Sequence, residues 1–503
     1  MAKTKRAVDG FTSLRRIMDA GGPMAAATGK RSFTASDSGN LFAGWVTQNV
    51  PTNTLLRQEL RKIRARSNDL ARNNDYFREF LRLLKVNVVG PKGLRLQARG
   101  VNRDGRPDTE GNQIVERAWA QWGKPGNCTV DGRGGLVDVF NQAIDSTARN
   151  GEVIIRIVRG YKHNAFRYGV QLIQPDLLDE TLNQELRNGR QIRMGIEMDQ
   201  WFRPLAYHFL TSHPNGDTWT LKGKRYVRIP ADQIIHAFIP VDEEQWRGLP
   251  WGVSAFTRLK MASGYEEAEL VAARTAASKM GFYKRLDDDH AEDDDVAVVQ
   301  HVSPGQLEML PANVDFESFD PQHPTTQFRD FMKGVLRGAS AGLGISYNVL
   351  AKDLEGVNYS SLRQGALEDR DAWQALQHWL IDHVCQPLFE DWLNWSLATG
   401  APALRPLSVR AYEKFAEPTW QPRGWSWVDP QKEVTAKEKE LSLGMTSLTR
   451  VAASRGEDLE EIFRERQRER ELAEQYGVDL TPAGPAAPGA TPTEGAADGP
   501  GDD

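Results

Sequence analysis

Hydrophobic side chains recur at helical spacing in four long segments of the chain. The first runs from Asn53 to Val86, and the second covers residues 252–283. The second is rich in alanine and contains no proline before Phe282, so it predicts a helix roughly 45 Å long. Residues 324–343 and 361–397 predict two more, the last kinked or split by Pro387. A helix longer than is usual in globular proteins favours a rod that spans something or packs against copies of itself.

The last two helices have predicted starts and buried faces. Thr325 or Thr326 is a suitable N-cap for one, and Ser360 or Ser361 for the other. The expected apolar stripes are Phe328, Phe331, Val335, Ala339 and Leu343, and then Trp373, Leu376, Leu380, Val384, Leu388 and Trp395.

Residues 93–240 read as mixed α/β structure with antiparallel strands, because short apolar runs are bounded by Gly, Asn, Asp and Pro. The predicted strands are Leu94–Ala98, Glu152–Val158, Tyr168–Ile173, Ile192–Met198, Leu205–Leu210 and Arg225–Ile229, with helices near Asn112–Trp122 and Leu136–Asn150. Two further short strands are expected at Val296–Val302 and Leu307–Leu310.

The two ends of the chain differ in composition from its centre. Residues 1–50 and 477–503 are rich in small residues and predict a flexible arm and a disordered tail. Residues 430–476 predict two or three short helices that stop at Gly444 and Gly456.

Composition excludes several classes of protein. The net charge of −5 argues against a general DNA-coating protein, and the two cysteines, Cys128 and Cys385, give no disulfide framework. No apolar run is long enough to span a membrane, so no membrane partner is expected.

No catalytic or cofactor motif stands out. Gly29-Lys30 fails the phosphate-loop pattern, and His383 and Cys385 lie two apart on a predicted helix, where side chains do not face each other. The acidic run around His290 lacks the spacing of a calcium loop and reads as a solvated loop. We therefore expect no enzyme activity, no cofactor and no metal. The run's aspartates are Asp287, Asp288, Asp289, Asp293, Asp294 and Asp295.

Three other features are unusual. Gly334, Gly338 and Gly342 place small residues on one helix face, which favours close helix packing or, alternatively, a flexible helix end. The loop 352–360 joins two long helices and could be a functional loop or an ordinary connection. A basic face could meet nucleic acid or simply be solvated; it comprises Arg57, Arg61, Lys62, Arg64, Arg66, Arg72, Arg78, Arg82 and Lys85.

Several short motifs, in order along roughly residues 50–475, resemble the portal proteins of lambda-like tailed phages. They are Asn73–Tyr76 with Asn87–Gly90, Gly151–Val153, Leu172–Asp179, Arg228–Ala231 with Ile234–His236, Arg247–Trp251, Tyr265–Leu270, Asp320–Pro324, Gly356–Ser361 and Gly424–Pro430.

The resemblance implies an α+β fold: an elongated subunit with a mixed α/β wing, a long helical stem, a small α/β clip, a tunnel loop and a helical crown. The implied parts are an N-terminal arm (1–50), wing (51–250), first stem helix (251–283), clip (284–323), second stem helix (324–343), tunnel loop (344–360), wing helix and connection (361–429), crown (430–476) and tail (477–503).

The function that the resemblance implies is a ring, typically of twelve subunits, at one vertex of the viral capsid. Duplex DNA would pass through its channel without sequence specificity during packaging and ejection. The implied partners are the large terminase motor, the head–tail adaptor, and the major capsid and scaffold proteins, with assembly in the host cytoplasm and final location in the virion.

Within this family picture, the residues expected to face DNA are Lys352, Asp353, Glu355 and Asn358, and the acidic run is expected to face the motor. The alternatives are another ring-forming head–tail connector or structural virion protein, and a nucleic-acid-processing enzyme, which would need a metal or nucleotide site.

Overall fold

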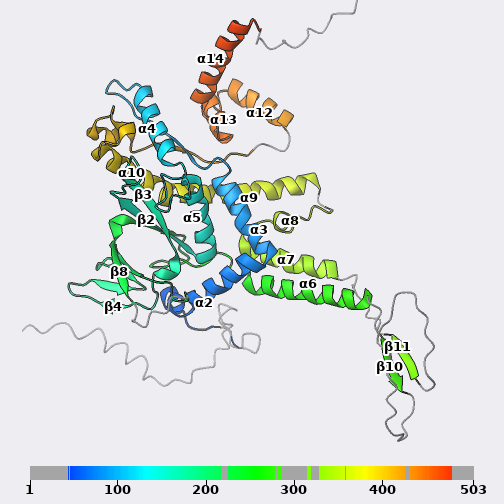
Figure 1. The fold of residues 1–503 in the computed structure, drawn as a ribbon. Helices are drawn as coiled ribbons and strands as arrows, with labels where there is room; N and C mark the ends of the chain where they lie inside the picture. The colour runs from blue at the N-terminus through cyan, green and yellow to red at the C-terminus, as the bar shows by residue number, and fades with distance from the viewer. Residues whose placement is uncertain are drawn as a thin grey trace, which may run out of the picture. The chain divides into compact units, whose positions relative to one another are not determined.

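The computed structural model describes residue 44 and residues 46–216, 225–277, 281–285, 314–318, 328–356, 358–425 and 430–478. The chain divides into two compact units, Met1–Pro51 and Thr52–Asp503. The described residues of the first unit carry no helix or strand. All elements below belong to the second unit (Figure 1). No helix in the described ranges is both apolar enough and long enough to cross a membrane.

The first predicted helix is in fact two helices, α2 (Thr52–Asn73) and α3 (Asp75–Leu84), followed by a π-helical turn over Lys85–Val89. The single-helix prediction is wrong because Asn74 leaves the helical conformation and caps α3, its side-chain oxygen accepting from Phe77 N at 2.9 Å. The Asn74 amide also donates to Ser263 Oγ at 2.7 Å, which ties the break to a distant helix.

Most strands of the described residues lie in two antiparallel sheets, and antiparallel pairing agrees with the strand pattern. The three-stranded sheet has the order β3-β2-β9 and the five-stranded sheet the order β4-β5-β6-β7-β8. The strands of the first are β2 (Glu152–Arg159), β3 (Tyr168–Ile173) and β9 (Ile234–Phe238). Those of the second are β4 (Gln184–Glu185), β5 (Gln191–Arg193), β6 (Ile196–Met198), β7 (Pro204–Leu210) and β8 (Tyr226–Pro230).

The predicted strand Ile192–Met198 is a hairpin rather than one strand. Met194 and Gly195 both have positive φ, at 49° and 84°, and reverse the chain between β5 and β6. The alternation of apolar residues continues across this turn, so the pattern alone does not reveal it. The prediction also missed β9, which pairs with the central strand β2.

Helices cover the three-stranded sheet and build the main core. α4 (Thr109–Trp122) and α5 (Leu136–Asn150) lie close to their predicted bounds. α4 packs with α10 (Gln386–Ala398) through an aromatic cluster of Trp119, Trp122, Phe389 and Trp392. The last three are fully buried, and all four belong to the largest hydrophobic core of the described residues.

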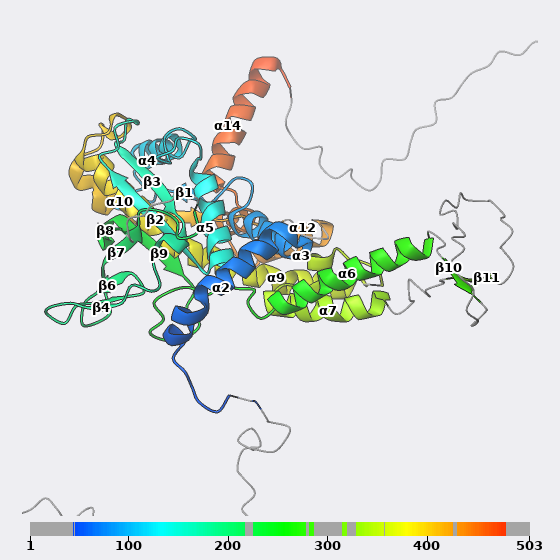
Figure 2. The same cartoon turned by 60° about the horizontal axis from the view of Figure 1, so that its bottom comes forward.

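The two predicted stem helices are α6 (Phe256–Ala277) and α7 (Phe328–Leu343), which lie side by side in both views (Figures 1 and 2). The predicted extension of the first to residue 283 is wrong. Residues Gly281–Arg285 form β10, antiparallel to β11 (Val314–Ser318), because Phe282 and Tyr283 after a glycine favour a strand. The predicted strands Val296–Val302 and Leu307–Leu310, and both threonine caps, lie outside the described residues.

The buried face of α7 is shifted from the predicted stripe. Ala339 and Leu343 are buried as expected, but Met332 and Leu336 are buried in addition, while Phe331 is 56% exposed. Phe331 lies beside Tyr265 of α6, with ring centroids 5.1 Å apart, at the edge of the helix pair.

After α7 the chain forms α8 (Tyr347–Ala351) and α9 (Tyr359–Leu380). The N-cap of α9 is Asn358, not the predicted Ser360 or Ser361, because its side-chain oxygen accepts from Ser361 N at 2.8 Å. A π-helical turn over Ile381–Cys385 separates α9 from α10, which has Pro387 in its first turn. The predicted split at the proline is confirmed.

The C-terminal described residues form three helices, in agreement with the prediction: α12 (Pro430–Ser442), α13 (Leu448–Ser454) and α14 (Leu459–Tyr476). Gly444 and Gly456 follow the first two with positive φ. The remaining elements are β1 (Arg95–Gln97), which pairs with β12 (Thr419–Gln421), and the short helix α11 (Tyr412–Phe415).

Candidate functional site

The Cys–His pair does not form a nucleophilic site. Burial raises the pKa of the Cys385 thiol well above its usual range, so the thiolate is disfavoured. His383 lies on the exposed side of the same turn, with Nδ1 3.0 Å from the carbonyl oxygen of Trp379. In the described part of the chain, no three His, Cys, Asp or Glu side chains are grouped so that they could hold a metal ion.

A buried charged cluster joins two of the short family-like motifs, Gly151-Glu152 and Arg247-Gly248. The Glu152 carboxylate accepts from Arg247 Nη2 at 2.6 Å and from Gly248 N at 2.9 Å. Arg64 Nη2 lies 2.8 Å from the same carboxylate, and His236 Nε2 lies 3.1 Å away. Burial opposes ionisation, but the Arg247 and Arg64 guanidiniums outweigh it and hold the pKa of Glu152 well below its usual range.

This cluster is structural. Arg247 also donates to the carbonyl oxygens of Leu178, Met194 and Pro175, at 2.8, 3.0 and 3.1 Å, so its donors are used within the protein. Neither the Glu152 nor the Arg247 side chain is exposed. The cluster therefore fastens α2, β2 and the segment before α6 to one another.

The predicted basic face of α2 and α3 is only partly a free surface. Arg64 is 1% exposed and belongs to the buried cluster, so its inclusion in that face was wrong. Arg61 pairs with Glu180 at 2.8 Å, and Lys85 with Asp145 at 3.2 Å. The positions Arg57, Arg66, Arg72 and Arg78 are exposed.

The loop between α7 and α9 is fastened by ion pairs on both sides. Lys352, which has a positive φ of 56°, pairs with Glu79 of α3 at 2.6 Å. Asp353 accepts from Tyr347 Oη at 2.8 Å and lies 3.3 Å from Lys333 Nζ. The Tyr347 hydrogen bond, the backbone N–H of Glu355 and the Lys333 ammonium lower the pKa of Asp353 to about 2.

The Lys352–Glu79 contact predicts a pH dependence of stability. Hydrogen bonds from Arg82 and then Lys352 outweigh partial burial and lower the pKa of Glu79 from 4.5 to about 2. Because the folded pKa is depressed, the contribution of Glu79 is present above about pH 4.5 and is lost as the pH falls towards 2. The difference in free energy of unfolding between the native chain and Glu79→Gln, measured by urea titration, should shrink over that interval.

The variant Lys352→Met distinguishes the contribution of Lys352 from that of Arg82. It should retain part of the pH dependence of stability, because Arg82 remains in place, 2.6 Å from Glu79. The depressed pKa of Glu79 would be contradicted if the difference in free energy of unfolding between the native chain and Glu79→Gln stayed constant from about pH 5 to about pH 2.

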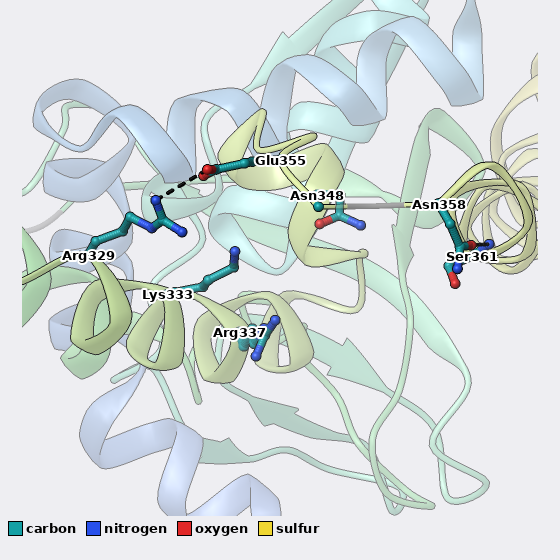
Figure 3. A pocket seen from close by; sticks show the side chains of 8 residues that line it. Arg329, Lys333, Arg337, Asn348, Glu355, Asn358 and Ser361 are labelled. Carbon is teal, nitrogen blue, oxygen red and sulfur yellow. Dashed lines mark hydrogen bonds and ion pairs between the residues drawn. The ribbon is translucent and has the colours of Figure 1, made fainter. Parts of the chain in front are cut away.

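Beside this loop lies a pocket of about 450 Å³ between α7, α8 and the start of α9. Figure 3 shows Arg329, Lys333 and Arg337 along one helix and Glu355 reaching Arg329 across the opening, at 3.2 Å. The lining is completed by Asn348, Gly356, Asn358 and Ser361.

The pocket contains two of the residues predicted to face DNA, Glu355 and Asn358, while Lys352 and Asp353 lie beside it in the same loop. Sequence reasoning missed the three basic residues of α7. Their spacing of four residues, which places them on one helix face, is a signal that the sequence already contained.

The three glycines of α7 are not equivalent. A Cβ at Gly338 would lie 2.8 Å from the Arg258 side chain, and one at Gly342 would lie 3.0 Å from Ser254 Oγ. A Cβ at Gly334 would meet nothing within 4 Å among the described residues. The acidic run Asp287–Asp295 lies outside the described residues.

Comparison with known proteins identifies the family. The sequence profile described as "Phage portal protein, lambda family" matches residues 38–377, more than half of the chain. A probable portal protein of Halomonas phage phiHAP-1 is 34% identical over 409 residues, covering 80% of this chain and 78% of the relative. Portal protein B of Escherichia phage lambda is 23% identical over 523 residues, covering 95% and 94%.

Among solved structures, a chain from the neck of an empty GTA particle is 14% identical with a TM-score of 0.42, covering 83% of this chain and 97% of that one. A structural similarity of this size supports no conclusion about the chain, and the family assignment rests on sequence alone. On the family profile and the 34% identity to the phiHAP-1 protein, the chain belongs to the lambda family of phage portal proteins.

Proposed function

We propose that copies of this chain assemble into a ring, typically of twelve subunits, whose channel carries duplex DNA into the capsid and out of it. The observation that carries the proposal is membership of the lambda family of portal proteins. The role is structural and involves no catalytic step by this chain. The ring would occupy one capsid vertex of the virion after assembly in the host cytoplasm.

The proposed parts follow the described elements. α6 and α7 would be the stem, β10 and β11 part of the clip, and α12 to α14 the crown. The two sheets with α4, α5, α9 and α10 would be the wing, and residues 344–360 the tunnel loop. The clip, with the acidic run Asp287–Asp295, would meet the terminase motor and later the head–tail adaptor; the wing would meet capsid and scaffold proteins.

The function is tested by a DNA-packaging assay. Proheads assembled with the native chain should protect duplex DNA from nuclease, whereas proheads lacking it should not. If the loop faces DNA, Lys352→Ala combined with Asp353→Ala should lower the amount of packaged DNA while leaving ring assembly intact. Normal packaging by this double variant would remove the loop from the proposal.

Packing between neighbouring stems yields a second prediction. A Cβ at Gly338 or Gly342 would meet residues in α6 or just before it, whereas a Cβ at Gly334 would meet nothing within 4 Å among the described residues. Gly334 is therefore the glycine of α7 that the helix of a neighbouring copy can approach closely. Gly334→Leu should fold normally and form several-fold fewer rings, measured by mass photometry at equal protein concentration.

The control for this variant is Ala120→Leu, which adds a similar side chain to the exposed position 120 of α4. It should leave the ring fraction unchanged. Equal ring fractions for Gly334→Leu and Ala120→Leu would remove Gly334 from the interface between subunits.

A further inference from the structure

The outer edge of β3 is only partly covered by the rest of the chain. On its inner side β3 pairs with β2 (Figure 2). On its outer side a short segment runs parallel to it: Val170 N donates to the carbonyl oxygen of Cys128, and Val130 N donates to that of Val170, both at 2.9 Å. The segment then turns away at Gly132, which has a φ of 69° and whose N–H donates to the carbonyl oxygen of Thr129 at 3.0 Å. The chain therefore covers this edge at one residue and leaves it.

Leu172 is the next position on the same edge. The N–H and C=O groups of successive strand residues alternate between the two sides of the strand. Because Val170 faces outward, Gln171 faces β2 and Leu172 faces outward again. Neither the N–H nor the C=O of Leu172 has a partner among the described residues. An edge position that carries no charge, proline or bulge can accept an added strand.

A groove of about 560 Å³ lies at this open position. Leu172 of β3 lines one side, Val139 of α5 lines another, and the loop that turns away from β3 contributes Asp131 and Arg133. Val139 is buried and Leu172 is half-buried, so the groove has an apolar part next to the free backbone groups. An extended segment along β3 would therefore meet hydrogen-bonding groups and an apolar surface together.

The charged groups of the lining favour a basic occupant. The lining contains two carboxylates, Asp131 and Asp138, and one guanidinium, Arg133, so its net charge is negative. Hydrogen bonds from the Thr129 hydroxyl and from the N–H of Arg133 lower the pKa of Asp131, which keeps it ionised. Asp138 accepts from the N–H of Gly135 at 2.9 Å, and neither carboxylate has an ion-pair partner among the described residues. A basic side chain is thus attracted to the groove.

We propose that the open edge of β3 binds an extended, basic segment of another protein as an added strand. The segment would accept a hydrogen bond from the N–H of Leu172 and donate one to its C=O. An apolar side chain of the segment would lie against Val139, and a lysine or arginine would pair with Asp131. The inference goes beyond the proposed function, because the edge can bind a strand without a ring and without DNA. Two backbone hydrogen bonds and one exposed ion pair make the binding weak and reversible.

The test uses the purified full-length chain and a fluorescein-labelled peptide, Thr-Val-Lys-Val-Lys-Thr, with affinity measured by fluorescence anisotropy at low salt. Two further peptides are N-methylated at alternate residues, one in each register. The alternation of valine and lysine fixes which residues face β3, so one methylated form should bind at least about tenfold more weakly and the other should bind like the parent. A peptide with glutamate in place of lysine should bind several-fold more weakly than the parent.

A matched pair of variants locates the site on the chain. Asp131→Asn should weaken binding of the lysine peptide about threefold, because the exposed ion pair is lost while the oxygen that accepts from Thr129 and Arg133 is kept. Asp104→Asn is the control. Its carboxylate likewise accepts from a backbone N–H two residues on, that of Arg106 at 3.1 Å, and its replacement should change the affinity less than about 1.5-fold.

Several results would overturn the inference. These are no binding of the lysine peptide up to about 1 mM, equal binding of the two methylated forms, or an equal effect of Asp131→Asn and Asp104→Asn. Peptide binding that falls as the concentration of the chain is raised would assign the edge to a second copy of this chain, which would overturn the assignment to another protein.

Discussion

Replacing Glu152 by glutamine is expected to lower the free energy of unfolding by about 3–5 kcal/mol. The substitution keeps the shape of the side chain but removes the charge that Arg64 and Arg247 share. Two guanidiniums would then remain in a region from which water is excluded, with no anion equally close to both. The loss of one partner from a buried ion pair costs far more than the pair itself contributes.

The measurement is the urea midpoint of unfolding, followed by tryptophan fluorescence. The matched control is Glu185→Gln, which removes the same charge from an exposed strand pair with Arg193 and should change stability by less than about 0.5 kcal/mol. Equal midpoints for the two variants would show that the buried cluster does not hold the fold together.

Replacing Gly248 by alanine is expected to destabilise the chain by at least about 3 kcal/mol or to prevent folding. An added Cβ would overlap the carbonyl group of Gly151, and a Cβ at Gly151 would in turn overlap the backbone of Gly248. Because the overlap is with backbone atoms, it cannot be relieved by the movement of a side chain. Gly248 N also donates to Glu152, which ties this contact to the charged cluster.

The comparison for Gly248→Ala is Gly264→Ala in α6, where a Cβ would meet nothing within 4 Å among the described residues. This variant should stabilise the helix by up to about 1 kcal/mol, because alanine favours a helix more than glycine does. A Gly248→Ala variant that is soluble and within about 0.5 kcal/mol of the native chain would refute the close contact.

The contrast between Glu152 and Arg64 shows what the sequence can and cannot predict. Local patterns located β2, β3, α5 and the split at Pro387, because each depends on neighbouring residues. The same patterns placed Arg64 on a basic surface, since its partner Glu152 is far away in the sequence and no periodicity links them. The two glycine-containing motifs were recognised separately, but only the structure shows that Gly151 and Gly248 touch.

Local features that an apolar pattern does not contain explain the other errors. Asn74 and Asn358 take over the role of helix caps by binding backbone N–H groups, which an apolar pattern does not register. The turn at Met194 and Gly195 interrupts a strand whose alternation continues unbroken. In the pocket, the sequence drew attention to the loop residues Glu355 and Asn358, whereas the cations that give it its charge come from a helix that was expected to serve only as a packing element.

The most direct test of the account is electron microscopy of the purified full-length chain, with a mass measurement on the same sample. The portal assignment predicts rings with a central hole and a mass of about twelve times 56.4 kDa. A chain that remains a monomer of 56.4 kDa at every concentration, with no rings in the images, would contradict it.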